Sequence, residues 1–175
     1  MQYDTKIILF LNDLVGRSAI FDGLILFFTS YVQYFLVAAL FLFLFYEREA
    51  RRTRIEILLT TIISVVVARF GVTSLIRLFY NRPRPFITLP VNNLFSESGG
   101  SFPSGHASFF FSMSAVVYIY NKAWGLVFFI ATVFMGLGRV MAGVHYFSDV
   151  VGGMVVGTIT AYIVFILLRK LETKI

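Results

Sequence analysis

The sequence predicts an all-α fold: a polytopic membrane helical bundle with about five transmembrane helices and interfacial helices at its N-terminus. Of its 175 residues, 58% are hydrophobic and 21 are Phe, whereas soluble domains average about 45–50% apolar residues. Five apolar stretches also approach the roughly 20 residues that cross a bilayer as a helix. Short connections, without a repeat or linker, indicate a single domain over residues 1–175.

The expected elements follow one another along the chain. Residues 5–14 and 18–28 are short and interrupted by polar residues, so they are expected to be interfacial helices. A single tilted helix over residues 18–46 is the alternative. The five spans are expected at residues 30–46, 55–79, 104–120, 123–140 and 149–168. Glycines in the last span, including Gly153 and Gly157, predict close contact with a neighbouring helix.

The N-terminal residues carry no evident cleavable signal. Their first apolar stretch, of about five residues, is too short for a signal core and is not followed by a small-residue cleavage pattern. They are therefore expected to belong to the mature fold.

The positions of the basic residues predict the orientation in the membrane. Cytoplasmic loops carry an excess of Lys and Arg, and the segment EREARRTR, residues 47–54, contains four arginines. If the spans alternate, the turn at residues 121–122 and the C-terminal tail share that cytoplasmic side. The loop at residues 80–103, the turn at residues 143–147 and the N-terminus are then expected on the outer side, so both histidines of the chain face outward.

Charge and cysteine content narrow the possible functions. The formal net charge is +6, but the basic residues lie at membrane edges and in one loop, so no nucleic acid partner is expected. Cysteine is absent, which excludes disulfides, thiolate metal ligands and a cysteine nucleophile.

Three segments at the expected outer face contain the residues suited to chemistry. They are RLFYNRPRP (residues 77–85), FPSGH (102–106) and GRVMAGVHYFSD (138–149). Arg77, Arg84 and Arg139 carry guanidinium groups that match phosphate oxygens, and three converging cations need a multiply charged anion between them. A helix that starts at Ser104 and Gly105 adds free N–H groups and the positive end of a dipole. These features predict a phosphate site.

The two histidines are candidates for nucleophilic and acid–base roles. His106 lies in the first turn of an expected helix, beside the predicted anion. His145 precedes Asp149 by four residues, a spacing that places both on one helical face. A carboxylate on one imidazole nitrogen leaves the other free to attack, so His145 is expected to attack phosphorus and His106 to protonate the departing oxygen.

A zinc site is the alternative use of the same residues. Two histidines and one carboxylate match a catalytic zinc shell in number. Three nearby guanidinium groups would oppose a cation, so no metal is expected.

The spacing Arg-x6-Arg-Pro, then Pro-Ser-Gly-His, then Gly-Arg-x5-His-x3-Asp resembles the three-part signature of the type 2 phosphatidic acid phosphatase family of integral-membrane lipid phosphatases. The resemblance implies a catalytic core at about residues 55–168. It implies a general acid at His106, a phosphohistidine at His145 and an orienting carboxylate at Asp149, without a cofactor. The residues implied to hold phosphate are Arg77, Arg84, Ser104, Gly105 and Arg139. Arg77 stands where the family usually has Lys, and Gly138 where it usually has Ser.

Within that family, the small size, the segment at residues 11–32 and the outward site resemble the bacterial undecaprenyl-diphosphate phosphatases of the bacitracin-resistance type, which act in the plasma membrane. This implies a lipid phosphate or diphosphate as the partner molecule. Phosphatidylglycerophosphate and phosphatidic acid phosphatases share the same core and stay as alternatives. A lipid-phosphate or anion transporter is the non-enzyme alternative, although it would not need an activated nucleophile. No oligomeric state is predicted.

Two further arginines are undecided. Arg69 lies in the middle of a span, where a charge is costly. It is expected to extend the polar cavity or to pair with a carboxylate such as Glu56, in a role that supports the site or the fold. Arg82 lies outside the three-part pattern, and arginines near membrane edges often serve only as anchors.

Overall fold

The computed structural model describes residues 2–46 and 51–172, and within them every regular element is helical. The elements are α1 (Gln2–Asn12), α2 (Ala19–Leu26), a π-helical segment (Phe27–Tyr31), α3 (Val32–Tyr46), α4 (Arg51–Val66), a second π-helical segment (Val67–Val72), α5 (Thr73–Phe79), α6 (Pro85–Thr88), α7 (Gly105–Tyr120), α8 (Lys122–Met141) and α9 (Phe147–Glu172). The predicted all-α membrane bundle is confirmed.

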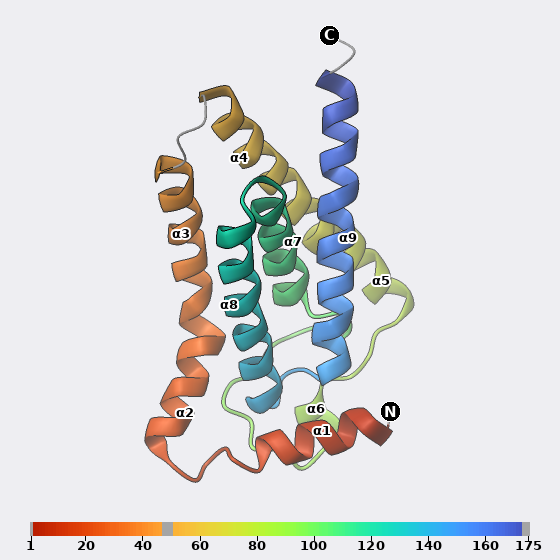
Figure 1. Ribbon diagram of the computed structural model, residues 1–175. Coiled ribbons are helices and arrows are strands. Elements are labelled where there is room, and N and C mark those ends of the chain that lie inside the picture. The colour runs from red at the N-terminus through yellow and green to blue at the C-terminus, as the bar shows by residue number, and fades with distance from the viewer. Residues whose placement is uncertain (1, 47–50, 173–175) are drawn as a thin grey trace.

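The central helix of the bundle is α7, and it is the shortest of the expected spans. Among the described residues, the helices long and apolar enough to cross a membrane are Ala19–Tyr46, Arg51–Phe79, Lys122–Met141 and Phe147–Leu171. In contrast, α7 packs against α4, α8 and α9, and most of its residues are buried. Its 16 residues rise about 24 Å at roughly 1.5 Å each, less than the roughly 30 Å of a hydrocarbon core. The helix α7 begins nearer the middle of the bundle than the point where α8 ends (Figure 1).

Residues 19–46 form one continuous helix, so the expectation of a separate interfacial helix at residues 18–28 is wrong and the single-helix alternative is right. The polar residue Asp22 lies in the first turn of this helix, where an acidic side chain is compatible with the helix dipole. Its carboxylate accepts a hydrogen bond from the Gly16 N–H at 3.0 Å, which stabilises the preceding turn. The other expected short helix exists as α1, which lies across one end of the bundle (Figure 1).

The predicted site segments and the basic segments lie at opposite ends of the bundle. α1, α6 and the connection between α8 and α9 gather at one end, whereas the start of α4 and the end of α9 lie at the other (Figure 1). Arg48 and Lys174 of the basic segments fall outside the described residues. The arrangement agrees with the expected alternation of the spans.

Glycines bring α9 very close to α7, as predicted. A Cβ added to Gly153 would lie 2.6 Å from the Ala107 Cβ, and Gly157, one turn later, is equally confined. The close approach brings the starts of the two helices together. There the Ser104 N–H donates a hydrogen bond to the Asp149 carbonyl oxygen at 2.9 Å. The FPSGH segment therefore meets the segment that follows α8.

Candidate active site

A sharp end to α8 positions His145. The Gly143 N–H donates to the Val140 carbonyl at 3.0 Å and the Val144 N–H donates to the Arg139 carbonyl at 3.2 Å, which is the Schellman pattern. Gly143 has a φ of 79°, a left-handed conformation that residues with a Cβ rarely adopt. Glycine at this position thus ends α8 and places His145 in the short connection to α9.

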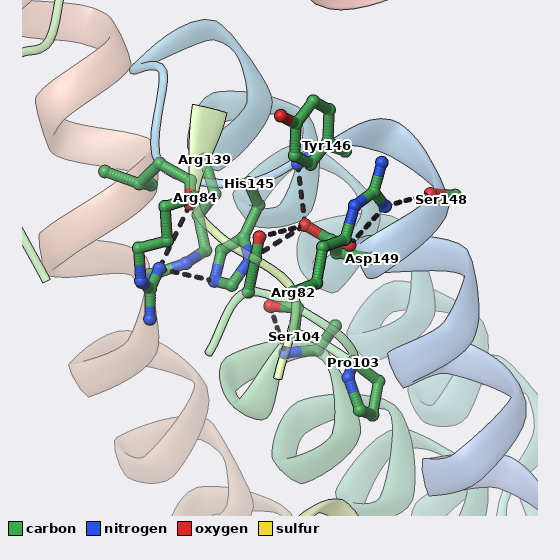
Figure 2. Close-up of polar contacts among 12 residues, drawn as sticks. Arg82, Arg84, Pro103, Ser104, Arg139, His145, Tyr146, Ser148 and Asp149 are labelled. Atoms are coloured by element: carbon green, nitrogen blue, oxygen red, sulfur yellow. Dashed lines mark hydrogen bonds and ion pairs between the residues drawn. The ribbon is translucent and has the colours of Figure 1, made fainter. Parts of the chain in front are cut away.

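His145 is 1% exposed, and its two ring nitrogens face different groups. Nδ1 lies 3.4 Å from Asp149 Oδ2, whereas Nε2 lies 3.3 Å from Arg84 Nη1 (Figure 2). A proton on Nδ1 toward the carboxylate leaves the Nε2 lone pair facing the arginine. The expected contact with Asp149 is present, but the two residues do not share a helical face. His145 precedes α9, and Asp149 folds back over the start of that helix.

Burial lowers the pKa of His145 to about 4; Asp149 opposes the shift, and Arg139 and Arg84 add to it. Because an ordinary histidine titrates near about 6.5, the imidazole of His145 is neutral at pH 7. A neutral imidazole is the form that can act as a nucleophile.

The carboxylate of Asp149 is fully buried and held from several sides. Oδ2 accepts the Tyr146 N–H at 2.8 Å and also the Ser101 hydroxyl. Oδ1 accepts from Arg82 Nη1 at 2.8 Å (Figure 2). The bond to Tyr146 runs from the third residue of α9 back to the residue that caps it, as in a capping box. These bonds leave the carboxylate little freedom to turn away from His145.

Arg82 links Asp149 to α1, so it is not a membrane-edge anchor. It is 6% exposed, and its guanidinium carbon lies 3.7 Å from the centre of the Tyr146 ring. Its Nη2 donates to Asp4 Oδ2 at 3.0 Å. Asp4 also accepts the Ser148 N–H at 3.0 Å, one of the free donors at the start of α9. No motif contains Asp4, and nothing local in the sequence indicates its contact with α9.

Glu97, which no sequence pattern singled out, is the anion at the centre of the site. Its carboxylate pairs with Arg84 at 2.9 Å and with Arg139. It also lies 3.7 Å from His145 Nε2 and 3.8 Å from His106 Nδ1. Burial alone would raise the pKa of Glu97, but the positive charges around it, Arg139 foremost, lower it to about 2. The one available signal was its position as the lone acidic residue of the loop at residues 81–102.

The predicted phosphate ligands do not all reach the cavity beside Glu97. Ser104 is completely buried and caps α7, its hydroxyl accepting the Ala107 N–H at 3.5 Å. Arg77 donates to the Pro103 carbonyl at 2.8 Å. Among the described residues, the Nε atoms of Arg77, Arg82 and Arg139 are buried without a hydrogen-bond partner, and of these three arginines Arg77 lines the cavity. The cavity, of about 340 Å³, is lined by Arg69, Arg77, Arg84, Ser96, Glu97, Ser98, Gly105 and His106.

The acidic groups of the site bind arginines. Asp149 pairs with Arg82, and Glu97 pairs with Arg84 and Arg139. Within residues 2–46 and 51–172, no three His, Cys, Asp or Glu side chains are grouped so as to hold a metal ion. The guanidinium groups of Arg84 and Arg139 supply positive charge at the site.

Buried arginines that face a neutral imidazole inside a helical membrane bundle fit one class of protein, the membrane lipid phosphatases. Comparison with known proteins agrees: the family model of the PAP2 superfamily matches residues 55–172, and the chain belongs to this superfamily.

Two curated relatives match over most of the chain. One is the "Bacitracin transport permease protein BcrC" of Bacillus licheniformis, 31% identical over 165 residues that cover 93% of this chain and 79% of that protein. The other is the "Undecaprenyl-diphosphatase BcrC" of Bacillus subtilis (strain 168), 29% identical over 158 residues that cover 89% and 79%.

Two solved structures share the fold. Aquifex aeolicus LpxE superposes with a TM-score of 0.74 at 25% identity and covers 91% of this chain and 93% of its own. The PAP2 type phosphatidylglycerolphosphate phosphatase of Bacillus subtilis gives a TM-score of 0.66 at 20% identity, with coverages of 99% and 86%. The chain is thus a multi-pass membrane hydrolase that acts on a lipid phosphate.

Proposed function

We propose that the protein hydrolyses undecaprenyl diphosphate to undecaprenyl phosphate and inorganic phosphate in the bacterial plasma membrane, with its site facing outward. The observation that supports phosphate chemistry is the position of Glu97. Its carboxylate pairs with two arginines and lies near both histidines. A terminal phosphate offers more oxygen atoms and more charge to the same partners. The name of the relative from B. subtilis supports the choice of lipid.

Entry of the phosphate requires Glu97 to leave. The carboxylate lies between the arginines and His145, and His145 itself is 1% exposed. Two anions with the same partners cannot be bound at once, because like charges at that distance repel. Substrate binding is thus an exchange of one anion for another, and the arginines stay paired throughout.

The first chemical step is attack by His145 Nε2 on the terminal phosphorus. The bond from that phosphorus to the bridging oxygen breaks, which forms a phosphohistidine and releases the lipid monophosphate. Asp149 keeps the proton on Nδ1 and stabilises the positive charge that develops on the ring. The arginines Arg77, Arg84 and Arg139 stabilise the charge on the phosphoryl oxygens.

In the second step water attacks the phosphorus of the phosphohistidine. The N–P bond breaks, inorganic phosphate leaves, and His145 is restored. The bound phosphate favours the protonated form of His106, which donates a proton to the departing lipid oxygen; the neutral ring then takes a proton from the water. Its side chain is 32% exposed and lines the cavity at the start of α7, so it can exchange protons with the substrate side.

A transporter of lipid phosphate is the candidate from another class; the name of the relative from B. licheniformis also describes a transporter, although its stated cargo is bacitracin. A carrier needs to bind and release an anion, for which the arginines suffice. It has no use for a buried imidazole whose tautomer is set by Asp149. The pair of His145 and Asp149 therefore favours the enzyme.

The direct test is phosphate release by the purified protein from undecaprenyl diphosphate, phosphatidic acid and phosphatidylglycerophosphate. We expect the highest kcat/KM for the diphosphate. The activity should persist in EDTA and be inhibited by vanadate, because guanidinium groups supply the charge stabilisation. A preference for phosphatidylglycerophosphate would identify the alternative phosphatase, and no release from any of the three would favour the transporter.

Cysteine labelling tests the side of the membrane, and the cysteine-free chain makes every introduced thiol unique. A membrane-impermeant thiol reagent applied to intact cells should label the Ser98→Cys variant but not Thr53→Cys. The reverse pattern would place the site in the cytoplasm.

A further inference from the structure

Arg69 lies at the boundary between two cavities, and the three-part pattern gives it no role. It belongs to the π-helical segment Val67–Val72 between α4 and α5. The polar cavity beside Glu97 includes Arg69, Gly105 and His106 in its wall. An apolar groove of about 350 Å³ shares those three residues. The other walls of the groove come from α3 and α7, with Tyr34, Val37 and Phe109 among them.

Among the residues that the structure describes, the charge of Arg69 has no counterion. Within residues 2–46 and 51–172, no carboxylate pairs with its guanidinium and no hydrogen bond to that group is formed. Glu56, the partner considered from the sequence, instead accepts the Tyr120 hydroxyl at 2.6 Å. A charge in a membrane-spanning segment is costly unless it meets a partner or a functional ligand. Of the two expectations for Arg69, the structure supports extension of the polar cavity.

The guanidinium lies directly against the first turn of α7. A Cβ added to Gly105 would lie 2.4 Å from Arg69 Nε, so glycine leaves the room that the side chain occupies. The group also contributes to the charge of the phosphate site. The pKa of Arg84 is lowered, mainly by burial, and the positive charge of Arg69 adds to the effect.

A lipid diphosphate has three parts in a row: the terminal phosphate, the phosphate that stays on the lipid, and the apolar chain. In the proposed reaction the terminal phosphate lies with Arg84, Arg139 and His145, and the apolar chain needs an apolar path. His106 faces the departing oxygen and lines both the polar cavity and the groove. The retained phosphate, which lies between that oxygen and the chain, therefore falls at the boundary occupied by Arg69.

We propose that Arg69 binds the retained phosphate of a lipid diphosphate and thereby selects diphosphates over monophosphates. This inference rests on the proposed function. As the bond from the terminal phosphorus to the bridging oxygen breaks, negative charge builds up on the retained phosphate, and Arg69 stabilises it. A lipid monophosphate places only its apolar chain at this position and gains no bond to the guanidinium, only its charge at longer range.

The test compares farnesyl diphosphate with farnesyl monophosphate, which carry the same isoprenoid chain and differ in one phosphate. Loss of a hydrogen bond between charged groups lowers binding or rate by roughly 10- to 100-fold. We expect Arg69→Gln to lower kcat/KM for the diphosphate by that factor and to change the monophosphate value by less than about threefold. Arg69→Lys keeps the charge without the planar fork and should lose less. Arg52→Gln, an exposed arginine of α4, is the matched control and should change neither value.

Each outcome decides the question. Equal losses on both substrates would show that Arg69 supports the site as a whole, and no loss on either would place it outside the substrate path; both results overturn the inference. If Arg69→Gln does not fold, Arg69→Lys decides through the ratio of its losses on the two substrates. Wild-type protein that releases phosphate neither from these two substrates nor from undecaprenyl diphosphate would instead refute the proposed function. A normal wild-type rate with an unchanged ratio in the variants refutes the role of Arg69 alone.

Discussion

The two histidines belong to two sides of the site that differ in burial and in charge pairing. On the nucleophile side, His145, Asp149 and Arg82 are at most 6% exposed, and the carboxylate between them accepts bonds from several donors. On the leaving-group side, the His106 side chain is 32% exposed and borders an apolar groove together with Arg69. The first side is built to hold one geometry, whereas the second is open toward the lipid.

The difference assigns different parts of the reaction to the two sides. The attack of His145 on phosphorus is the same step for every phosphate ester. A nucleophile that its hydrogen bonds hold rigidly in place therefore serves all substrates. The departing group differs between a diphosphate and a monophosphate, and it lies on the open side. Substitutions on the nucleophile side should therefore affect all substrates alike, and substitutions on the leaving-group side should discriminate among them.

The largest expected effect is that of His145→Ala. Removal of a catalytic nucleophile typically costs several orders of magnitude in kcat, so activity should fall below about 1% of wild type on every substrate. Phosphate binding and the thermal unfolding midpoint should change little, since the arginines remain. Activity above a few per cent in a folded variant would contradict the assignment of the nucleophile.

His106→Ala should separate the substrates. A departing phosphate monoester has a second pKa of about 6 and leaves readily, whereas an alkoxide is comparable with water, whose pKa is about 15.7, and needs a proton. We expect a loss of about 10²–10⁴-fold on phosphatidic acid and a much smaller loss on undecaprenyl diphosphate. Comparable losses on the two lipids would mean that His106 holds the phosphate or shapes the site instead of delivering the proton.

Arg82→Gln tests whether the nucleophile side depends on its support. The substitution leaves Asp149 Oδ1 and Asp4 without their charged partner, and a misplaced catalytic group typically costs about 10²-fold. The loss should fall on kcat with KM nearly unchanged and should be equal for all substrates, with partial recovery in Arg82→Lys. Arg17→Gln at the same end of the bundle breaks only an exposed pair with Asp13 and serves as the control.

Protonation of His145 is expected to have the smallest effect at neutral pH. Its pH dependence tests directly whether the imidazole is buried. Since the chain has only two histidines, His106→Gln leaves one imidazole for observation by nuclear magnetic resonance. Burial lowers the pKa of His145 to about 4, so the ring should stay neutral as the pH falls from 7 to 5. The free energy of unfolding contributed by this neutral ring is present above the unfolded value of about 6.5. It is lost as the pH falls through that value toward 4. A midpoint between 6 and 7 would show that His145 is not desolvated.

Much of the fold and part of the site were accessible from local patterns. Apolar runs predicted the spanning helices, because a bilayer requires every spanning backbone to satisfy its own hydrogen bonds. The alternation of the spans predicted that His106 and His145 would share one face, and both lie near Glu97; the predicted contact between His145 and Asp149 is also present. Those inferences succeeded because they depend on residues close in sequence or on one coarse property, hydropathy.

Tertiary structure alone decided which charges meet. Asp4 reaches Ser148 across 144 residues, and Glu97 enters the site from a loop without regular structure. Arg82 turned from an undecided residue into the link between α1 and Asp149, and residues 19–46 proved to be one helix with Asp22 in its first turn. Hydropathy and the spacing of residues in the sequence indicate how costly it is to bury a residue. They do not record the partner that offsets a buried charge, because that partner is selected by distance in space, and the chain brings it there only when it folds.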